Sequence, residues 1–89
     1  MERDFSFIFA DAVLFEEMRQ AAAGAHVNEL REFKPVEMFR SASIGVGKYS
    51  ILLRAKFQSS DRTLREEEVA QWSAKIVAAL QGLGGTQRA

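Results

Sequence analysis

The sequence predicts an α+β fold in which two helices cover one face of a four-stranded antiparallel sheet. Three observations support this prediction. Three segments alternate apolar and polar residues, as half-buried strands do, and two others repeat apolar residues every three or four positions, as amphipathic helices do. These segments follow one another as strand, helix, strand, strand, helix, with room for a short final strand. This is the order of the ferredoxin-like β-α-β-β-α-β sandwich.

The first third of the chain predicts a strand followed by a helix. Residues 3–10 read RDFSFIFA, so the three phenylalanines share one face and the polar residues and Ile8 share the other. Because every second side chain of a strand points the same way, the phenylalanines should enter the core. From Leu14 to Ala25 the apolar residues recur at helical spacing instead, which predicts a short amphipathic helix.

The middle third predicts two strands joined by a glycine-containing loop. Residues 26–35 are mixed in polarity and end in the only proline, so we expect a connection there and a second strand at 36–40. The next loop contains Gly45 and Gly47, which should allow positive φ in a hairpin connection. The third strand should cover residues 49–58, with Tyr49 and the odd-numbered apolar residues on the core side.

The last third predicts a second helix and an edge strand. The segment Thr63-Leu-Arg-Glu66 matches a capping box, in which the Thr63 hydroxyl and the Glu66 carboxylate satisfy free backbone donors, so the helix should begin there. An apolar stripe that includes Trp72 should pack in the core. Glycines at the end of this helix should terminate it, and residues 86–89 can then form a short edge strand.

Composition limits the classes of function. Eighty-nine residues, 47% of them apolar and 27% charged, suffice for one globular domain, residues 1–89. The sequence contains no cysteine, which excludes disulfides, thiolate zinc sites and cysteine nucleophiles. No apolar stretch reaches the roughly 20 residues that a membrane-spanning helix needs, so we expect a cytoplasmic protein. Net charge is zero, but residues 34–58 carry five basic side chains and one acidic side chain, a balance of +4.

Several motifs resemble ligand sites but have simpler explanations. GVGKYS at 45–50 contains a Gly-Lys pair, yet a phosphate-binding P-loop needs an earlier glycine, where this chain has Ala42, and a helix after the lysine. His26 has no second histidine or cysteine with which to bind a metal. Glutamates 66–68 are best explained by the positive end of a helix dipole. No nucleophile, base or metal cluster converges, so we predict that this chain is not itself an enzyme.

The sheet face that the helices leave open should carry the functional side chains. An aromatic ring, small hydroxyls and cations on this face would suit a nucleic acid base. The third strand lacks the aromatic pair of an RNA-recognition motif, and residues 10–15 lack the arginine and glycine of an acylphosphatase. Strand parity places the following residues on the open face: Asp4, Ser6, Ile8, Glu37, Phe39, Ser50, Leu52, Arg54 and Lys56.

A resemblance to a known family rests on four segments: RDFSFIF at 3–9, VEMFR at 36–40, GKYSILLRAKFQSSDRTLREEEV at 47–69 and KIVAALQGLGG at 75–85. In this order they resemble the ferredoxin-fold anticodon-binding domain of the bacterial phenylalanine–tRNA ligase β chain. The resemblance implies an excised C-terminal module of a class II enzyme that uses ATP and magnesium in its α chain, so we expect no cofactor here. The implied partners are the anticodon stem-loop of tRNA(Phe), the rest of the β chain and the α chain of an (αβ)2 enzyme, with no membrane.

The resemblance also implies roles for individual residues. The aromatic residue that stacks on the first anticodon base corresponds to Phe39, and small residues near that base correspond to Ser6 and Ser50. Glu37 replaces an acidic residue that could accept a hydrogen bond from a base edge. Most members have tyrosine at Phe39 and glycine at Ser41; phenylalanine keeps stacking, worth about 1–3 kcal/mol per base, but loses a hydroxyl hydrogen bond worth about 0.5–1.5 kcal/mol. We expect phosphates to be held by Arg40, Lys48, Arg54 and Lys56.

A competing hypothesis is a protein-interaction or dimerisation module on the same fold, without RNA binding. Ile8, Phe39 and Leu52 would then form an apolar contact patch. Solution mass and the salt dependence of RNA binding distinguish the two hypotheses.

Overall fold

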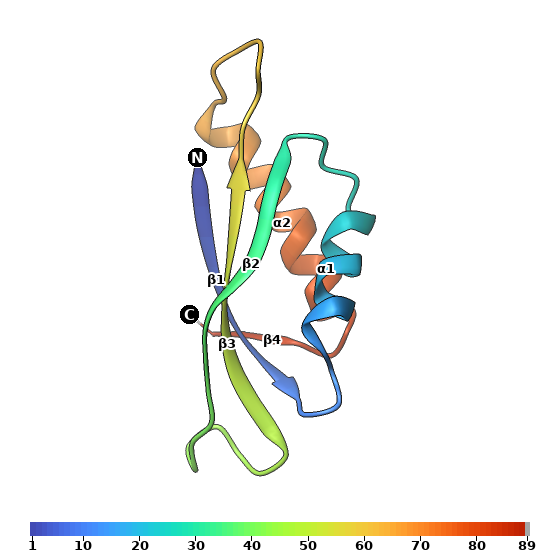
Figure 1. Cartoon of the computed structure of the whole chain (residues 1–89), viewed down its shortest axis with the longest axis vertical. Helices are drawn as coiled ribbons and strands as arrows, with labels where there is room; N and C mark the ends of the chain where they lie inside the picture. Colours follow the sequence, from blue (N-terminus) through green and yellow to red (C-terminus); the bar gives the residue numbers. More distant parts are fainter. Residues whose placement is uncertain (89) are drawn as a thin grey trace.

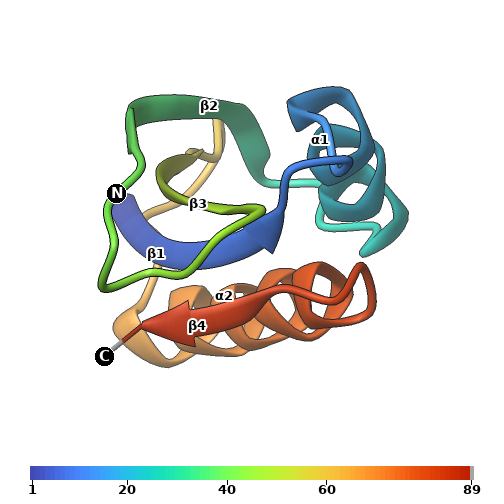
Figure 2. The same cartoon turned by 90° about the horizontal axis from the view of Figure 1, so that it is seen from below.

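The computed structural model describes residues 1–88 and has the predicted order of elements (Figure 1). The strands form one antiparallel sheet in the order β2-β3-β1-β4, and α1 and α2 pack against each other on the same side of it (Figure 2). The ferredoxin-like α+β fold is therefore confirmed. No helix among residues 1–88 is long and apolar enough to cross a membrane. The elements are β1 (Glu2–Ala10), α1 (Phe15–Gly24), β2 (Leu30–Phe39), β3 (Lys48–Phe57), α2 (Glu66–Gln81) and β4 (Thr86–Arg88).

The core lies between the two central strands and the helices, as the apolar periodicity predicted. Register pairs Phe5 with Leu53, Phe7 with Ile51 and Phe9 with Tyr49, so the alternating apolar residues of β1 and β3 lie side by side. These side chains are buried together with Met18 and Ala22 of α1 and Val69, Ile76 and Leu80 of α2. The ring of Trp72 lies 5.7 Å from that of Phe57, which confirms its predicted place in the core.

Strand β2 begins at Leu30, so the predicted start at residue 36 is wrong. The sequence predicts that Pro35 ends a connection, but Pro35 lies inside the strand. β2 is an edge strand, and edge strands tolerate proline because one side of the strand has no ladder hydrogen bonds to lose. Pairing also shifts register between Pro35 and Glu37, an irregularity that accommodates the ring. The first half of β2 is held under α1, where Phe33 stacks on Phe15 with ring centroids 5.9 Å apart.

The start of α2 also differs from the predicted capping box. The residue before the helix is Arg65, and its backbone N–H donates to Glu68 Oε1 at 3.2 Å. The Thr63–Glu66 box is therefore wrong; Glu66 forms an ion pair with Arg3 of β1 instead. Three consecutive glutamates offer the same local pattern in more than one register, and contacts to arginines outside the helix decide between them.

The β2–β3 hairpin and the C-terminal edge strand agree with the predictions from the sequence. Gly45 and Gly47 have φ values of 115° and 76°, which confirms their predicted role in the connection from β2 to β3. The carbonyl of Gly47 accepts a hydrogen bond from the N–H of Asp11 at 2.9 Å, which ties the hairpin to the turn after β1. β4 confirms the short edge strand over Thr86–Arg88, and Ala89 lies outside the described residues.

Gly85→Ala should lower the free energy of unfolding by about 1–3 kcal/mol through overpacking. A Cβ at this position would lie 2.6 Å from Cε1 of Phe9 and 2.9 Å from Cδ2 of Phe7. Gly24→Ala, at the end of α1, is the control because no atom lies within 4 Å of its Cβ, so its stability should be unchanged or slightly higher. Urea denaturation followed by the fluorescence of Trp72 measures both variants. Equal stabilities would contradict the close approach of residue 85 to β1.

Candidate nucleic-acid interface

Strand register arranges the open face of the sheet in four rows. Every residue that parity placed on this face lies in one of them, which confirms the predicted membership. Five residues join the predicted set: Glu2 of β1, Glu32 and Lys34 of β2, and Thr86 and Arg88 of β4. The rows are Glu32–Lys56–Glu2, Lys34–Arg54–Asp4, Glu37–Leu52–Ser6–Arg88 and Phe39–Ser50–Ile8–Thr86.

The two rows nearest the start of β1 neutralise their own charges. Arg54 donates two hydrogen bonds to Asp4, from Nε at 2.8 Å and from Nη2 at 3.0 Å, and Glu2 lies 3.8 Å away. The hydrogen bond from Arg54 lowers the pKa of the Asp4 carboxyl below its ordinary value. Lys34 lies 2.8 Å from Glu32. The guanidinium of Arg54, which we expected to hold a phosphate, is thus already engaged by a carboxylate.

The opposite end of the open face presents an exposed aromatic ring. Phe39 is the last residue of β2, is 48% exposed and pairs with Ser50 of β3, so its predicted exposure is confirmed. Val36 and Met38 of the same strand are 42% and 61% exposed, although strand alternation places them on the side of the sheet that the helices cover. α1 stacks on β2 at Phe33, and the hairpin beyond that contact extends past the helices (Figure 1).

Ser50 differs from its prediction. It lies on the open face but is only 1% exposed, because Ile8 and Phe39 flank it in its row and Arg88 covers it. Nη1 of Arg88 lies 3.3 Å from the hydroxyl oxygen and donates to it. The expectation that Ser50 offers an open surface is therefore wrong, and its hydroxyl orients Arg88 instead. Ser6 is half-buried.

Arg88 is a residue of this face that the sequence pattern did not reveal. Its side chain starts on β4 and reaches past β1 to a residue of β3. It is exposed and forms no ion pair with any residue from 1 to 88. Parity would have placed it here if the register of β4 on β1 were known, but three residues carry no pattern that fixes a register.

The remaining predicted cations divide between the two sides of the sheet. Arg40 forms an ion pair with Asp11, and its guanidinium lies 5.5 Å from the ring centroid of Tyr49, a buried residue of the covered face. It therefore points away from Phe39. Lys48, at the start of β3, has the parity of Ser50 and is exposed, and Lys56 is exposed in the first row. Within residues 1–88, neither lysine forms an ion pair.

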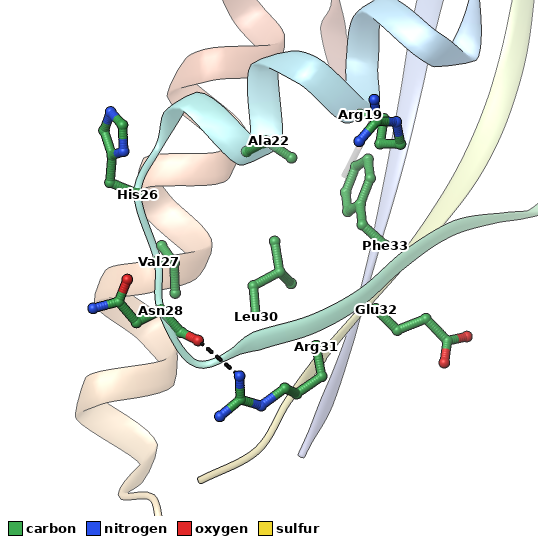
Figure 3. A pocket seen from close by; sticks show the side chains of 10 residues that line it. Arg19, Ala22, His26, Val27, Asn28, Leu30, Arg31, Glu32 and Phe33 are labelled. Carbon is green, nitrogen blue, oxygen red and sulfur yellow. Dashed lines mark hydrogen bonds between the residues drawn. The ribbon is translucent and has the colours of Figure 1, made fainter.

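Apart from the open face, the surface has a hollow between α1 and the start of β2 (Figure 3). Its volume is about 430 Å³, and Arg19, His26 and Arg31 line it together with apolar side chains. Arg19 is occupied by Glu16, with Nε 2.8 Å from Oε1, and Arg31 donates to the backbone carbonyl of Asn28 at 3.2 Å. Both arginines of the hollow therefore bind groups of the chain itself. Residues 1–88 contain no group of three or more His, Asp or Glu side chains that could hold a metal.

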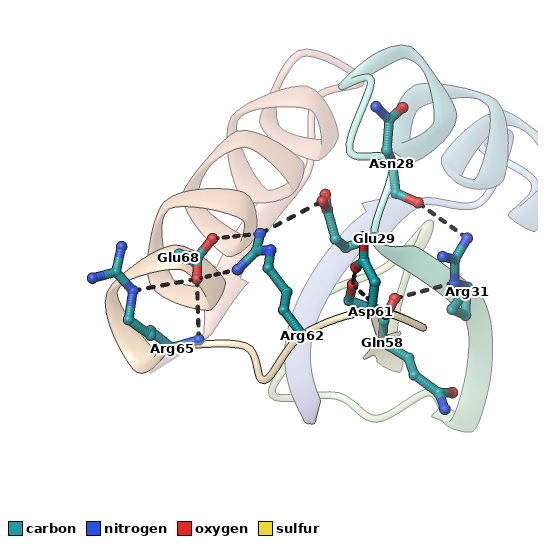
Figure 4. Close-up of polar contacts among 9 residues, drawn as sticks. Asn28, Glu29, Arg31, Gln58, Asp61, Arg62, Arg65 and Glu68 are labelled. Carbon is teal, nitrogen blue, oxygen red and sulfur yellow. Dashed lines mark hydrogen bonds and ion pairs between the residues drawn. The ribbon is translucent and has the colours of Figure 1, made fainter.

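A second polar cluster joins the connection from α1 to β2 with the connection from β3 to α2 (Figure 4). Arg62 lies 2.7 Å from Glu68 and 3.8 Å from Glu29, and Arg31 donates to the carbonyl of Gln58 at 3.1 Å. The hydrogen bond from Arg62 lowers the pKa of Glu68 to about 2. This cluster stabilises the end of the molecule opposite the hairpin.

The comparisons with known proteins agree with this geometry. Residues 1–88 match the family model described as the ferredoxin-fold anticodon binding domain. The chain is 34% identical to the phenylalanine–tRNA ligase beta subunit of Ruegeria pomeroyi over 89 residues, 99% of this chain and 11% of that relative. The corresponding subunit of Brucella abortus is 32% identical over 99% of this chain and 11% of its own length. That of Streptococcus mutans is 30% identical over 90% of this chain. The chain spans about a tenth of the length of these curated relatives.

Glu68→Gln should destabilise the protein at neutral pH and have little effect in acid. The lowered pKa of Glu68 means that its carboxylate stabilises the fold above the ordinary value of 4.5, and that this contribution is lost as the pH falls toward about 2. Urea denaturation between about pH 7 and about pH 2 measures the difference from wild type. Glu67→Gln is the control, because Glu67 has no ion pair within residues 1–88. A pH-independent difference for Glu68→Gln would contradict the role of the charged pair.

Proposed function

This chain belongs to the ferredoxin-fold anticodon binding domain family, and on that premise we propose that it binds the anticodon stem-loop of tRNA(Phe) through the open face of its sheet. One observation carries the proposal. The exposed ring of Phe39 lies at the end of the face where Lys48 and Arg88 have no acidic partner within residues 1–88. A flat apolar surface beside free cations suits a stacked base and its phosphate.

In this mechanism a base stacks on Phe39, and the phosphate backbone follows the free cations. Because Phe39 ends an edge strand, its ring is approachable from beyond the sheet as well as from above. Arg88, held by the hydroxyl of Ser50, presents its remaining donors to a base edge or a phosphate oxygen. Lys48 adds electrostatic attraction, and Lys56 adds less because Glu2 and Glu32 flank it in its row. Glu37 accepts a hydrogen bond from a base amino group. Arg54 and Arg40 contribute less, because Asp4 and Asp11 already bind them.

Within a phenylalanine–tRNA ligase, this module would position the tRNA and would not perform chemistry. We assign the aminoacylation, with its ATP and magnesium, to the α chain of the class II enzyme. The partners of the module are then the tRNA, the rest of the β chain and the α chain, in the cytoplasm where translation takes place. Isolated binding should be weak, because the remainder of such an enzyme would share the contacts with the tRNA.

The second candidate function is contact with another protein chain, without RNA. The observation that favours it is the apolar exposure of Val36, Met38 and Phe39 on an edge strand. A dimer built through this edge would appear in sedimentation as a mass that rises with concentration. A monomer that binds RNA with a strong salt dependence supports the first function.

Phe39→Ala should weaken binding of the tRNA(Phe) anticodon stem-loop by about 1–3 kcal/mol, or roughly five- to 150-fold, because the stacking surface is lost. Phe39→Tyr keeps the ring and should bind at least as well as wild type. Leu14→Ala is the matched control, since Leu14 is 64% exposed but lies in the turn before α1. Fluorescence anisotropy with labelled RNA at low salt measures all of them. Wild-type affinity for Phe39→Ala would refute the sheet-face mechanism.

Arg88→Met should weaken the same binding by about tenfold, the loss of one charge-assisted hydrogen bond. Arg54→Met should cost less, because Asp4 already neutralises Arg54. Asp4→Asn should instead strengthen binding by about fivefold, since removing one negative charge is worth roughly 1 kcal/mol. The three affinities, measured by anisotropy at one salt concentration, form the test. A larger loss for Arg54→Met than for Arg88→Met would reverse the assigned order of the two arginines.

A further inference from the structure

We propose that the tip of the β2–β3 hairpin binds a second nucleotide of the same RNA, next to the one stacked on Phe39. The inference rests on the proposed function and extends it to residues outside the sheet face. Residues 40–42 and 45–48 line a hollow of about 340 Å³ at this tip. That volume lies within the range of small-ligand sites, about 300–1,000 Å³.

The hollow has an apolar wall that the fold itself does not use. Val46 is fully exposed, at 103%, and lies between Gly45 and Gly47. Both glycines have positive φ, which L side chains rarely adopt, so the loop shape depends on them. A valine at the tip of such a loop buries no surface in this molecule. It would bury apolar surface only against a ligand.

The rim of the hollow carries two cations. The aliphatic stem of Lys48 passes over the loop, since a Cβ on Gly45 would lie 3.9 Å from its Cδ. Its ammonium group forms no ion pair with residues 1–88. On the other side Arg40 is held in place by Asp11 and the ring of Tyr49. Since Asp11 already neutralises Arg40, the ammonium group of Lys48 is the cation of this rim that can bind an anion. An apolar wall beside such a cation suits a ligand with a flat apolar body and an anionic group, which is the chemistry of a nucleotide.

The hollow begins next to the open face along the chain. Phe39 ends β2 and is followed directly by Arg40 and Ser41, which line the hollow. Lys48 has the same parity as Ser50, the partner of Phe39, and therefore lies on the RNA-facing side. The hydroxyls of Ser41 and Ser43 hydrogen-bond to each other at 2.9 Å, and the oxygen of Ser41, which lines the hollow, keeps a lone pair that can accept from a ribose hydroxyl. A strand of RNA that stacks one base on Phe39 thus brings its neighbour to the hairpin tip.

Two variants test the inference in the full chain, with the tRNA(Phe) anticodon stem-loop as the probe. Val46→Ser should bind about fivefold more weakly, because the apolar contact is lost. Lys48→Met should reduce the slope of log K against log salt by about 0.7, the value for one phosphate contact to a single strand. Leu14→Ser and Lys75→Met are the matched controls, since both residues are exposed and neither lines the hollow: Leu14 caps the start of α1 and Lys75 lies on α2. Both controls should bind like wild type.

Phe39→Ala, measured in the same titration, separates this inference from the proposed function. If Phe39→Ala weakens binding while Val46→Ser and Lys48→Met match wild type, the hairpin site is refuted and the sheet-face function stands. If the wild-type chain does not bind the RNA, the proposed function fails and the inference with it. If Val46→Ser leaves RNA affinity unchanged but abolishes a concentration-dependent dimer, the tip is a contact between copies and the inference is overturned.

Discussion

The pairing of β1 with β3 is the constraint on which the rest of the structure depends. Its register runs without a shift from Glu2 opposite Lys56 to Ala10 opposite Lys48. Because side chains alternate along a strand, burying the three phenylalanines of β1 against the helices sends the intervening residues to the other face. The chemistry of the open face is therefore fixed by the packing of the core. A slip of one residue would exchange the two faces completely.

This coupling explains why the sequence predicts the fold and the membership of the open face so well. Alternation and helical spacing are local properties, and both were strong in β1, β3 and α2. The predictions failed where a local pattern has two solutions. Pro35 ends a central strand but is tolerated in an edge strand, and only the assembled sheet decides that β2 lies at an edge. The glutamates in the first turn of α2 likewise fit several capping registers until Arg62 and Arg65 select Glu68.

The electrostatics of the site lie beyond such patterns, because ionic partners meet only in three dimensions. Arg54 and Asp4 are 50 residues apart, and nothing in their local sequence indicates that they bind each other. The same is true of Arg88 and Ser50, which are 38 residues apart. Sequence parity placed Arg54 and Lys56 on the open side, and the strand register adds Lys34 and Arg88. The structure also separates the cations that carboxylates neutralise from those that none of residues 1–88 neutralises.

The charge on the open face is paired at one end and unpaired at the end near the β2–β3 hairpin, where apolar side chains are also exposed. Since α1 stacks on β2 at Phe33, the far end of β2 and the loop after it lack a helix to cover their apolar side chains. The same end carries Lys48 and receives Arg88, whereas the helix-covered end pairs Arg54 with Asp4 and Lys34 with Glu32. Apolar exposure and unbalanced positive charge thus coincide at one end of a molecule 46 Å long. The helices do not cover the apolar side chains at this end. An anionic, aromatic ligand would bury that apolar surface and pair with the positive charge. The packing of the core therefore leaves apolar surface and unbalanced positive charge at the hairpin end of the sheet, where we propose that RNA binds.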